Sequence, residues 1–191
     1  MSSLSPVVVG FDFSRSGGAA LHRAVTLAAR APFHVLHVVC VIDPNAPIPS
    51  IPSYNGIDDM YAARVQAALT VEIQDELDKA EVEDRVHFFV HARSGHAAGE
   101  ILALAREVGA DLIIVGSKGL TGLERLLAGS TSEQVVREAG CTVEVARPKR
   151  YPEVEVIPIE VLEPEPHGLP PHRYTYEDHR VSLRPAEWPL S

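Results

Sequence analysis

The sequence predicts an α/β fold: a doubly wound, three-layer sandwich with a five-stranded parallel sheet, followed by an extension rich in proline and glutamate. Strand and helix patterns alternate along residues 1–150. The predicted strands are nearly continuous apolar runs, which are typical of parallel strands covered by helices on both faces. Residues 151–191 differ, since eight of the chain's fifteen prolines fall there. We therefore expect one domain over residues 1–150 and an acidic, proline-rich C-terminal extension over residues 151–191.

The first half of the domain is predicted to hold two strands and two helices. Residues 7–9 form a short β-branched strand that ends at Gly10. Apolar residues at helical spacing then indicate a helix: Leu21, Ala24, Val25 and Ala28. Residues 34–42 are a second apolar strand, and the four prolines in residues 43–57 predict a long loop. A helix from residue 58 to about residue 84 follows from one apolar face: Leu69, Ile73, Leu77 and Ala80.

The second half is predicted to hold three strands and two helices. In chain order these are residues 85–91 (strand), 97–109 (helix), 111–115 (strand), 132–139 (helix) and 142–146 (strand). Glu144 interrupts the last strand, and a polar position within an alternating pattern is typical of a sheet edge. Right-handed crossovers between parallel strands complete the expected sandwich.

Composition and charge argue against several classes of protein. The net charge of −9 argues against a nucleic-acid surface, which usually shows clustered Lys and Arg. No apolar run approaches the ~20 residues that a membrane-spanning helix needs. The first residues show no basic region followed by a long apolar stretch, so we expect no signal peptide. These observations predict a cytoplasmic protein that binds neither nucleic acid nor membrane.

The cysteines and histidines do not follow a metal-binding pattern. Cys40 and Cys141 both lie in apolar runs, so each is interpreted as a small buried side chain. The nine histidines have no accompanying cysteines at zinc-site spacing. His87 and His91 are expected to point the same way from one strand, but the third ligand that a zinc site needs is missing.

The segment between the fourth strand and the last helix is unusually rich in glycine and hydroxyl residues: Gly116, Gly119, Gly122, Gly129, Ser130, Thr131 and Ser132. Gly116 and Gly119 would let backbone N–H groups approach a ligand. Ser130 and Glu133 fit a capping box, and the start of the helix would attract an anion. In the alternative interpretation, the glycines only turn the chain and the serines only cap the helix. The sequence contains no Walker A motif, dinucleotide fingerprint or nucleophile elbow.

The spacing Gly116-x2-Gly119-x9-Gly129-Ser130 resembles the ATP-binding motif of the universal stress protein family. The runs VVVGFDFS, VLHVV and ADLIIVGSKG resemble characteristic strands of that family, and the similarity covers about residues 5–148. The resemblance implies an adenine nucleotide alpha hydrolase-like fold. The sequence departs from the family pattern at three places. Phe11 stands where many relatives have a smaller residue, Thr142 stands where many have proline, and the C-terminal extension has no counterpart in the minimal family domain.

The resemblance also implies a site for ATP. Asp12, after the first strand, would hold the ribose or adenine end, and the backbone of Val38, at the end of the second strand, would contact adenine. Phosphates would be wrapped by the motif residues Gly116, Gly119, Gly129, Ser130 and Thr131. Mg²⁺ would bind through the phosphates, since the sequence shows no separate carboxylate cluster.

The function implied is that of a regulatory, ATP-binding protein in stress response, which hydrolyses ATP slowly at most. No positioned general base or arginine finger is evident in the sequence. A homodimer would form through the last core strand, whose edge has unpaired backbone groups. The alternative is a protein-interaction module in which the extension recruits a partner and the nucleotide pocket is not functional.

Overall fold

The computed structural model describes residues 4–53, 56–82, 86–117 and 131–148. Five strands form one sheet: β1 (Ser5–Gly10), β2 (His34–Ile42), β3 (His87–Ser94), β4 (Leu112–Gly116) and β5 (Thr142–Ala146). All neighbouring strands are parallel, and their order is β3-β2-β1-β4-β5. The predicted five-stranded parallel sheet is confirmed, and β5 pairs with β4 at one edge, as expected. The C-terminal extension lies outside the described residues.

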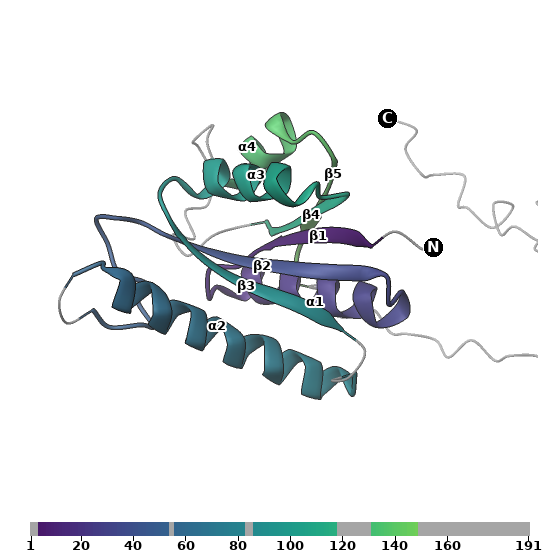
Figure 1. The fold of residues 1–191 in the computed structure, drawn as a ribbon, viewed down its shortest axis with the longest axis horizontal. Helices are drawn as coiled ribbons and strands as arrows, with labels where there is room; N and C mark the ends of the chain where they lie inside the picture. Colours follow the sequence, from purple (N-terminus) through teal and green to yellow (C-terminus); the bar gives the residue numbers. More distant parts are fainter. Residues whose placement is uncertain (1–3, 54–55, 83–85, 118–130, 149–191) are drawn as a thin grey trace, which may run out of the picture. The chain divides into compact units, whose positions relative to one another are not determined.

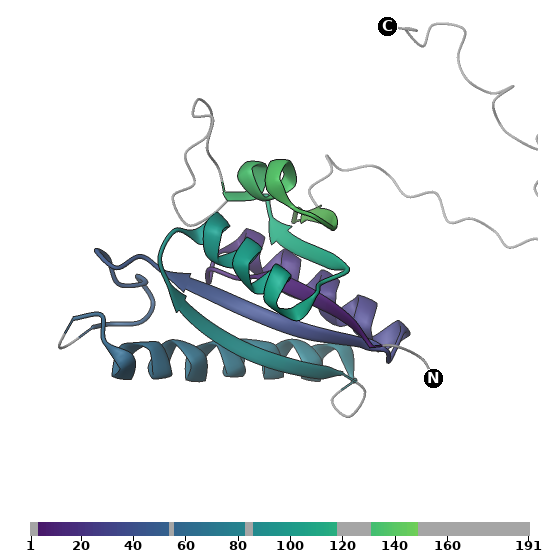
Figure 2. The same cartoon turned by 45° about the horizontal axis from the view of Figure 1, so that its top comes forward.

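Helices cover both faces of the sheet (Figure 1). Helices α1 (Arg15–Arg30) and α2 (Asp59–Ala80) pack on one face, and α3 (Ala97–Val108) and α4 (Thr131–Glu138) pack on the other. Figure 2 shows α3 lying over β1 and β2, while β3 forms the sheet edge beside α2. None of the helices in the described residues is long and apolar enough to cross a membrane.

Successive strand residues belong to different cores because side chains alternate between the two faces of a strand. In β1, Val7 and Val9 pack with α1 and α2, whereas Val8 packs with α3 and α4. In β2, Val38 joins the first core and Val39 the second. This alternation decides which residues of each strand can reach a site on a given face.

Strand β3 runs three residues further than the sequence predicted. The prediction ended this strand at His91. The structure pairs Arg93 with Val41 and Ser94 with Ile42. Because β2 extends to Ile42, β3 can continue to pair with it as far as Ser94, and Arg93 therefore belongs to the edge strand of the sheet.

The proline-rich loop after β2 is held by one buried hydroxyl group. The side chain of Tyr61, on α2, is fully buried. Its hydroxyl accepts a hydrogen bond from the Ile48 N–H (2.6 Å) and donates one to the Ile51 carbonyl (3.1 Å). Asp58 caps the same helix by accepting from the Tyr61 N–H at 2.8 Å. The loop is thus attached to the core at a point that its own sequence does not reveal.

Candidate functional site

A pocket opens at the carboxyl edge of the sheet, between β1 and β4. These strands lie side by side, and the chain leaves them toward opposite faces of the sheet, which makes this the topological switch point where α/β proteins bind ligands. The pocket is lined by Gly10, Phe11, Asp12, Val39, Val41, Ala97, Ile101, Val115, Gly116, Thr131 and Ser132. The lining comes from three strands, α3 and the start of α4.

Most of the pocket wall is apolar. Strands β2 and β4 contribute Val39, Val41 and Val115, and α3 contributes Ile101. Phe11 is part of this wall and is buried against the ring of Phe13, with centroids 5.0 Å apart and planes at 73°. Such a wall suits a flat apolar group better than a charged one.

The backbone turns sharply directly after Asp12. Phe13 has φ 59°, a left-handed conformation that is uncommon for residues other than glycine. Strained positions of this kind gather at functional sites. The turn connects the end of β1 to the start of α1, where Ser14 is the N-cap residue.

The Asp12 carboxylate is held by the beginning of α1. Its Oδ1 accepts from the Ser14 N–H at 3.1 Å, and Ser14 Oγ accepts from the Gly17 N–H at 3.0 Å. A Cβ at Gly17 would lie only 2.5 Å from Asp12 Oδ1. Glycine at position 17 therefore makes room for this carboxylate at the pocket.

Gly116 and Thr131, both predicted site residues, line the same pocket as Asp12. Gly116 is also required by packing, because a Cβ there would lie 2.6 Å and 2.7 Å from the Ser16 backbone C and O atoms. Thr131 begins α4, next to Ser132. The other predicted residues of the motif, Gly119, Gly129 and Ser130, lie outside the described residues.

Val38 does not lie where the sequence analysis placed it along β2, and the predicted contact of its backbone with adenine stays a prediction. This residue is not at the end of β2 but in its middle, between Val9 of β1 and Val90 of β3. Its fully buried side chain belongs to the core of α1 and α2. The pocket is instead lined by Val39 and Val41, since β2 continues to Ile42 and alternation turns these two residues toward α3.

Sequence reasoning missed five apolar lining residues: Val39, Val41, Ala97, Ile101 and Val115. Val39 and Val41 could have been found from the length of the second strand together with side-chain alternation. Ala97 and Ile101 follow the helical spacing of one face of α3, but the sequence does not say which face meets the pocket.

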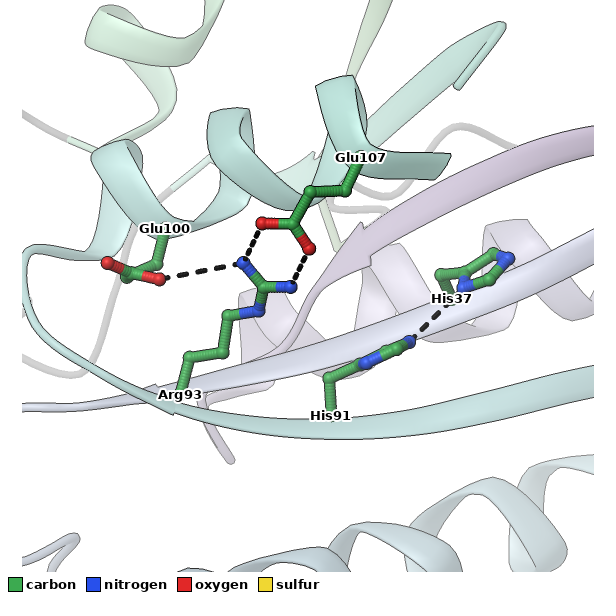
Figure 3. Close-up of polar contacts among 5 residues, drawn as sticks. All are labelled: His37, His91, Arg93, Glu100 and Glu107. Atoms are coloured by element: carbon green, nitrogen blue, oxygen red, sulfur yellow. Dashed lines mark hydrogen bonds and ion pairs between the residues drawn. The ribbon is translucent and has the colours of Figure 1, made fainter. Parts of the chain in front are cut away.

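A polar network lies beside the pocket, on β2, β3 and α3 (Figure 3). His37 Nδ1 lies 3.1 Å from His91 Nε2, and the guanidinium of Arg93 contacts Glu100 and Glu107. Burial lowers the pKa of both His37 and His91. The nearby His37 and Arg93 lower the pKa of His91 further. Among the described residues no group of three or more His, Cys, Asp or Glu side chains could hold a metal ion.

Comparisons with known proteins agree on one family. The universal stress protein family model matches residues 4–147. A universal stress protein of Methanocaldococcus jannaschii is 32% identical over 147 residues, which cover 75% of this chain and 83% of that protein. A 50-residue stretch is 54% identical to a putative universal stress protein of Staphylococcus epidermidis, and it spans only 30% of that relative's length and 26% of this chain.

Solved structures share the fold. The universal stress protein UspA from Lactobacillus plantarum superposes with a TM-score of 0.55 at 24% identity, over 77% of this chain and all of that one. A universal stress protein in complex with cAMP superposes with a TM-score of 0.54 at 25% identity, over 76% of this chain and 98% of that one.

Proposed function

The chain belongs to the universal stress protein family, and we propose that it is a regulatory protein that binds ATP in the pocket between β1 and β4. In this proposal the occupancy of the pocket changes the shape of the protein or its choice of partner in a stress response. The protein hydrolyses ATP slowly at most.

The observation that carries the proposal is the set of chemical groups that line this one pocket. Apolar side chains of β2 and α3 lie at one part of the wall, the Asp12 carboxylate follows β1, and the hydroxyl residues Thr131 and Ser132 begin α4. A purine fits the apolar part, a ribose hydroxyl donates to a carboxylate, and a helix start attracts phosphate oxygens. A nucleotide presents all three kinds of group in one molecule.

A similar protein supports this assignment. The universal stress protein in complex with cAMP covers 76% of this chain at 25% identity, and cAMP joins a purine, a ribose and a phosphate. For this chain we propose the adenine nucleotide with the longer phosphate chain, because the predicted motif extends through Gly119, Gly129 and Ser130.

Magnesium fits the proposal as an ion carried by the nucleotide. No metal-binding group of three or more His, Cys, Asp or Glu side chains occurs in the part of the chain that the structure describes. Mg²⁺ commonly binds through substrate phosphates and few protein ligands. Thr131 and Ser132 are the described residues whose hydroxyl groups would lie nearest the phosphates and their ion.

The test is isothermal titration of the full chain with ATP, ADP, AMP and cAMP, each with and without Mg²⁺. Asp12→Asn removes the charge but keeps an oxygen that can accept the Ser14 N–H, so the turn is preserved. Asp111→Asn is the matched control, because Asp111 is exposed and precedes β4 at the opposite end of that strand. We expect at least tenfold weaker binding for Asp12→Asn and no change for Asp111→Asn.

Two results would contradict different parts of the proposal. If the wild-type chain binds none of the four nucleotides, the proposed function is wrong. If it binds ATP and Asp12→Asn binds equally well, the nucleotide site is elsewhere. Preference for AMP or cAMP over ATP would leave nucleotide binding in place and would overturn the choice of ATP.

The alternative function, recruitment of a partner by the C-terminal extension, rests on residues 151–191, which lie outside the described residues. It stays a prediction from their composition. The titration separates it from the main proposal, because an interaction module with a non-functional pocket binds no nucleotide.

A further inference from the structure

Arg93 links the edge strand β3 to helix α3, over the neighbouring strand β2 (Figure 3). Its Nη1 donates to Glu107 Oε1 at 2.9 Å, and its Nη2 contacts Glu107 Oε2. Nη1 also lies 3.7 Å from Glu100 Oε2. The Arg93 side chain is 21% exposed, whereas those of Glu100 and Glu107 are 34% and 56% exposed. The planar guanidinium thus forms a forked contact with Glu107 and a longer ion pair with Glu100, both at the surface of one helix.

The two glutamates and the pocket residues occupy different stripes of α3. Glu100 and Glu107 are seven residues apart, so they lie on the same side of the helix and about 10 Å apart along it. Ala97 and Ile101, which line the pocket, lie on a stripe roughly 90° away around the helix. A contact that holds both glutamates therefore fixes the rotation of α3 and with it the pocket wall.

The strand register puts Arg93 next to a pocket residue. Arg93 pairs with Val41 of β2, and Val41 lines the pocket. The contact between Arg93 and α3 thus lies beside the apolar wall formed by Val41 and Ile101. Side chains from β2 and α3 both line the pocket at this place.

The turn between β3 and α3 is shaped to receive Glu100. Gly95 has φ 148°, and its N–H donates to the Ile42 carbonyl at 3.0 Å. A Cβ at Gly95 would lie 3.2 Å from Glu100 Oε1, so the glycine leaves space for this side chain. The N-cap residue His96 makes no side-chain capping hydrogen bond.

We propose that Arg93 is a positioning residue for the pocket. Its contacts with Glu107 and Glu100 hold α3 at the rotation that places Ala97 and Ile101 against the ligand. The effect on ligand affinity rests on the proposed function, whereas the effect on α3 does not. Arg93 acts through the helix and does not itself contact the nucleotide.

The test compares Arg93→Lys and Arg93→Gln with the wild-type full chain. Lysine keeps the charge and loses the fork, so a response to lysine separates forked geometry from charge. Arg23→Gln is the matched control, since the Arg23 contact with Glu144 links α1 to β5, outside the pocket. Two quantities are measured: amide hydrogen exchange of residues 98–108 without ligand, and the affinity for ATP and AMP.

We expect both Arg93 variants to exchange faster in α3 and to bind nucleotide at least tenfold more weakly, while Arg23→Gln changes neither quantity. Exchanging the charges, Arg93→Glu with Glu107→Arg, should restore part of the protection in α3. Unchanged exchange of α3 in both Arg93 variants overturns the proposal, and so does unchanged affinity in a chain that binds nucleotide. If the wild-type chain binds no nucleotide, the proposed function fails, and faster exchange in α3 still supports the positioning role.

Discussion

His37 and His91, which are 54 residues apart in the chain, share a hydrogen bond between neighbouring strands of the sheet. His37 Nδ1 and His91 Nε2 are 3.1 Å apart, while the ring centroids are 5.3 Å apart and the planes differ by 21°. The two nitrogens thus lie between the rings. One nitrogen must donate and the other accept, so the pair holds its hydrogen bond only while at least one of the two facing nitrogens carries no proton.

This pair predicts that acid weakens the fold. Burial lowers the pKa of both histidines, and the proximity of His37 and Arg93 lowers that of His91 further, while Glu107 opposes this shift. Because the unfolded chain then binds more protons than the folded one, the free energy of unfolding falls as pH drops from about 6.5 through the lowered folded values. Above about 6.5 this contribution is fully present. Urea titrations between pH 8 and pH 5 measure it.

The control for the pH prediction is His87→Gln, since His87 is an exposed residue of the same strand. It should keep the pH dependence, whereas replacing both His37 and His91 by Gln should flatten it. The charged groups near the pair are Arg93 of β3 and Glu107 of α3, so Glu107→Gln should be tested alongside. An equal slope in the wild type and the double variant would contradict the prediction.

Tyr61→Phe is expected to reduce the free energy of unfolding by about 1–3 kcal/mol. The hydroxyl is buried and serves the Ile48 N–H and the Ile51 carbonyl, so its loss leaves two polar groups of the loop without this partner. Thr70→Ala removes an exposed hydroxyl from the same helix and should change stability by less than about 0.5 kcal/mol. Chemical denaturation compares the two, and equal effects would mean that the Tyr61 hydroxyl does not anchor the loop.

The fold could be predicted because its signals are local. The strand His34–Ile42 has the bounds that the sequence predicted. The prolines in residues 43–57 exclude a helix or a central strand in the segment that follows it. Parallel pairing then follows from apolar strands that alternate with helices. The end of β3 could not be predicted in this way, because Arg93 and Ser94 belong to the strand through their pairing with Val41 and Ile42.

The site could be predicted less well because it depends on which face each side chain takes. Asp12, Gly116 and Thr131, which the family resemblance predicted as site residues, line one pocket. Val38 and Val39 are neighbours in sequence but belong to opposite cores, and only the register of β2 separates them. The meeting of His37 with His91 likewise depends on the register between β2 and β3, which a single sequence does not encode locally.

The β5 edge is expected to carry a homodimer. In the described residues β5 pairs with β4 alone, and Val145 on β5 and Val136 on α4 are exposed apolar side chains, 37% and 55% exposed. An edge with unpaired backbone groups favours two-fold strand pairing. Val145→Arg should shift the sedimentation of the full chain toward a monomer, whereas Phe89→Arg on the opposite edge strand should not. A wild-type monomer at high protein concentration would contradict the prediction.

The adjacent glycines of α1 should respond in opposite ways to alanine. A Cβ at Gly17 would lie 2.5 Å from Asp12 Oδ1 and 3.1 Å from the Asp12 N, so Gly17→Ala must displace the carboxylate and should both destabilise the fold and weaken nucleotide binding. Gly18 has no atom within 4 Å of its would-be Cβ, and it lies within the helix. Gly18→Ala should therefore raise the free energy of unfolding by about 0.5–1 kcal/mol, since alanine is the better helix former. Thermal unfolding and nucleotide titration of the two variants check the signs. Destabilisation by both, or unchanged binding in Gly17→Ala, would show that Gly17 does not serve the carboxylate.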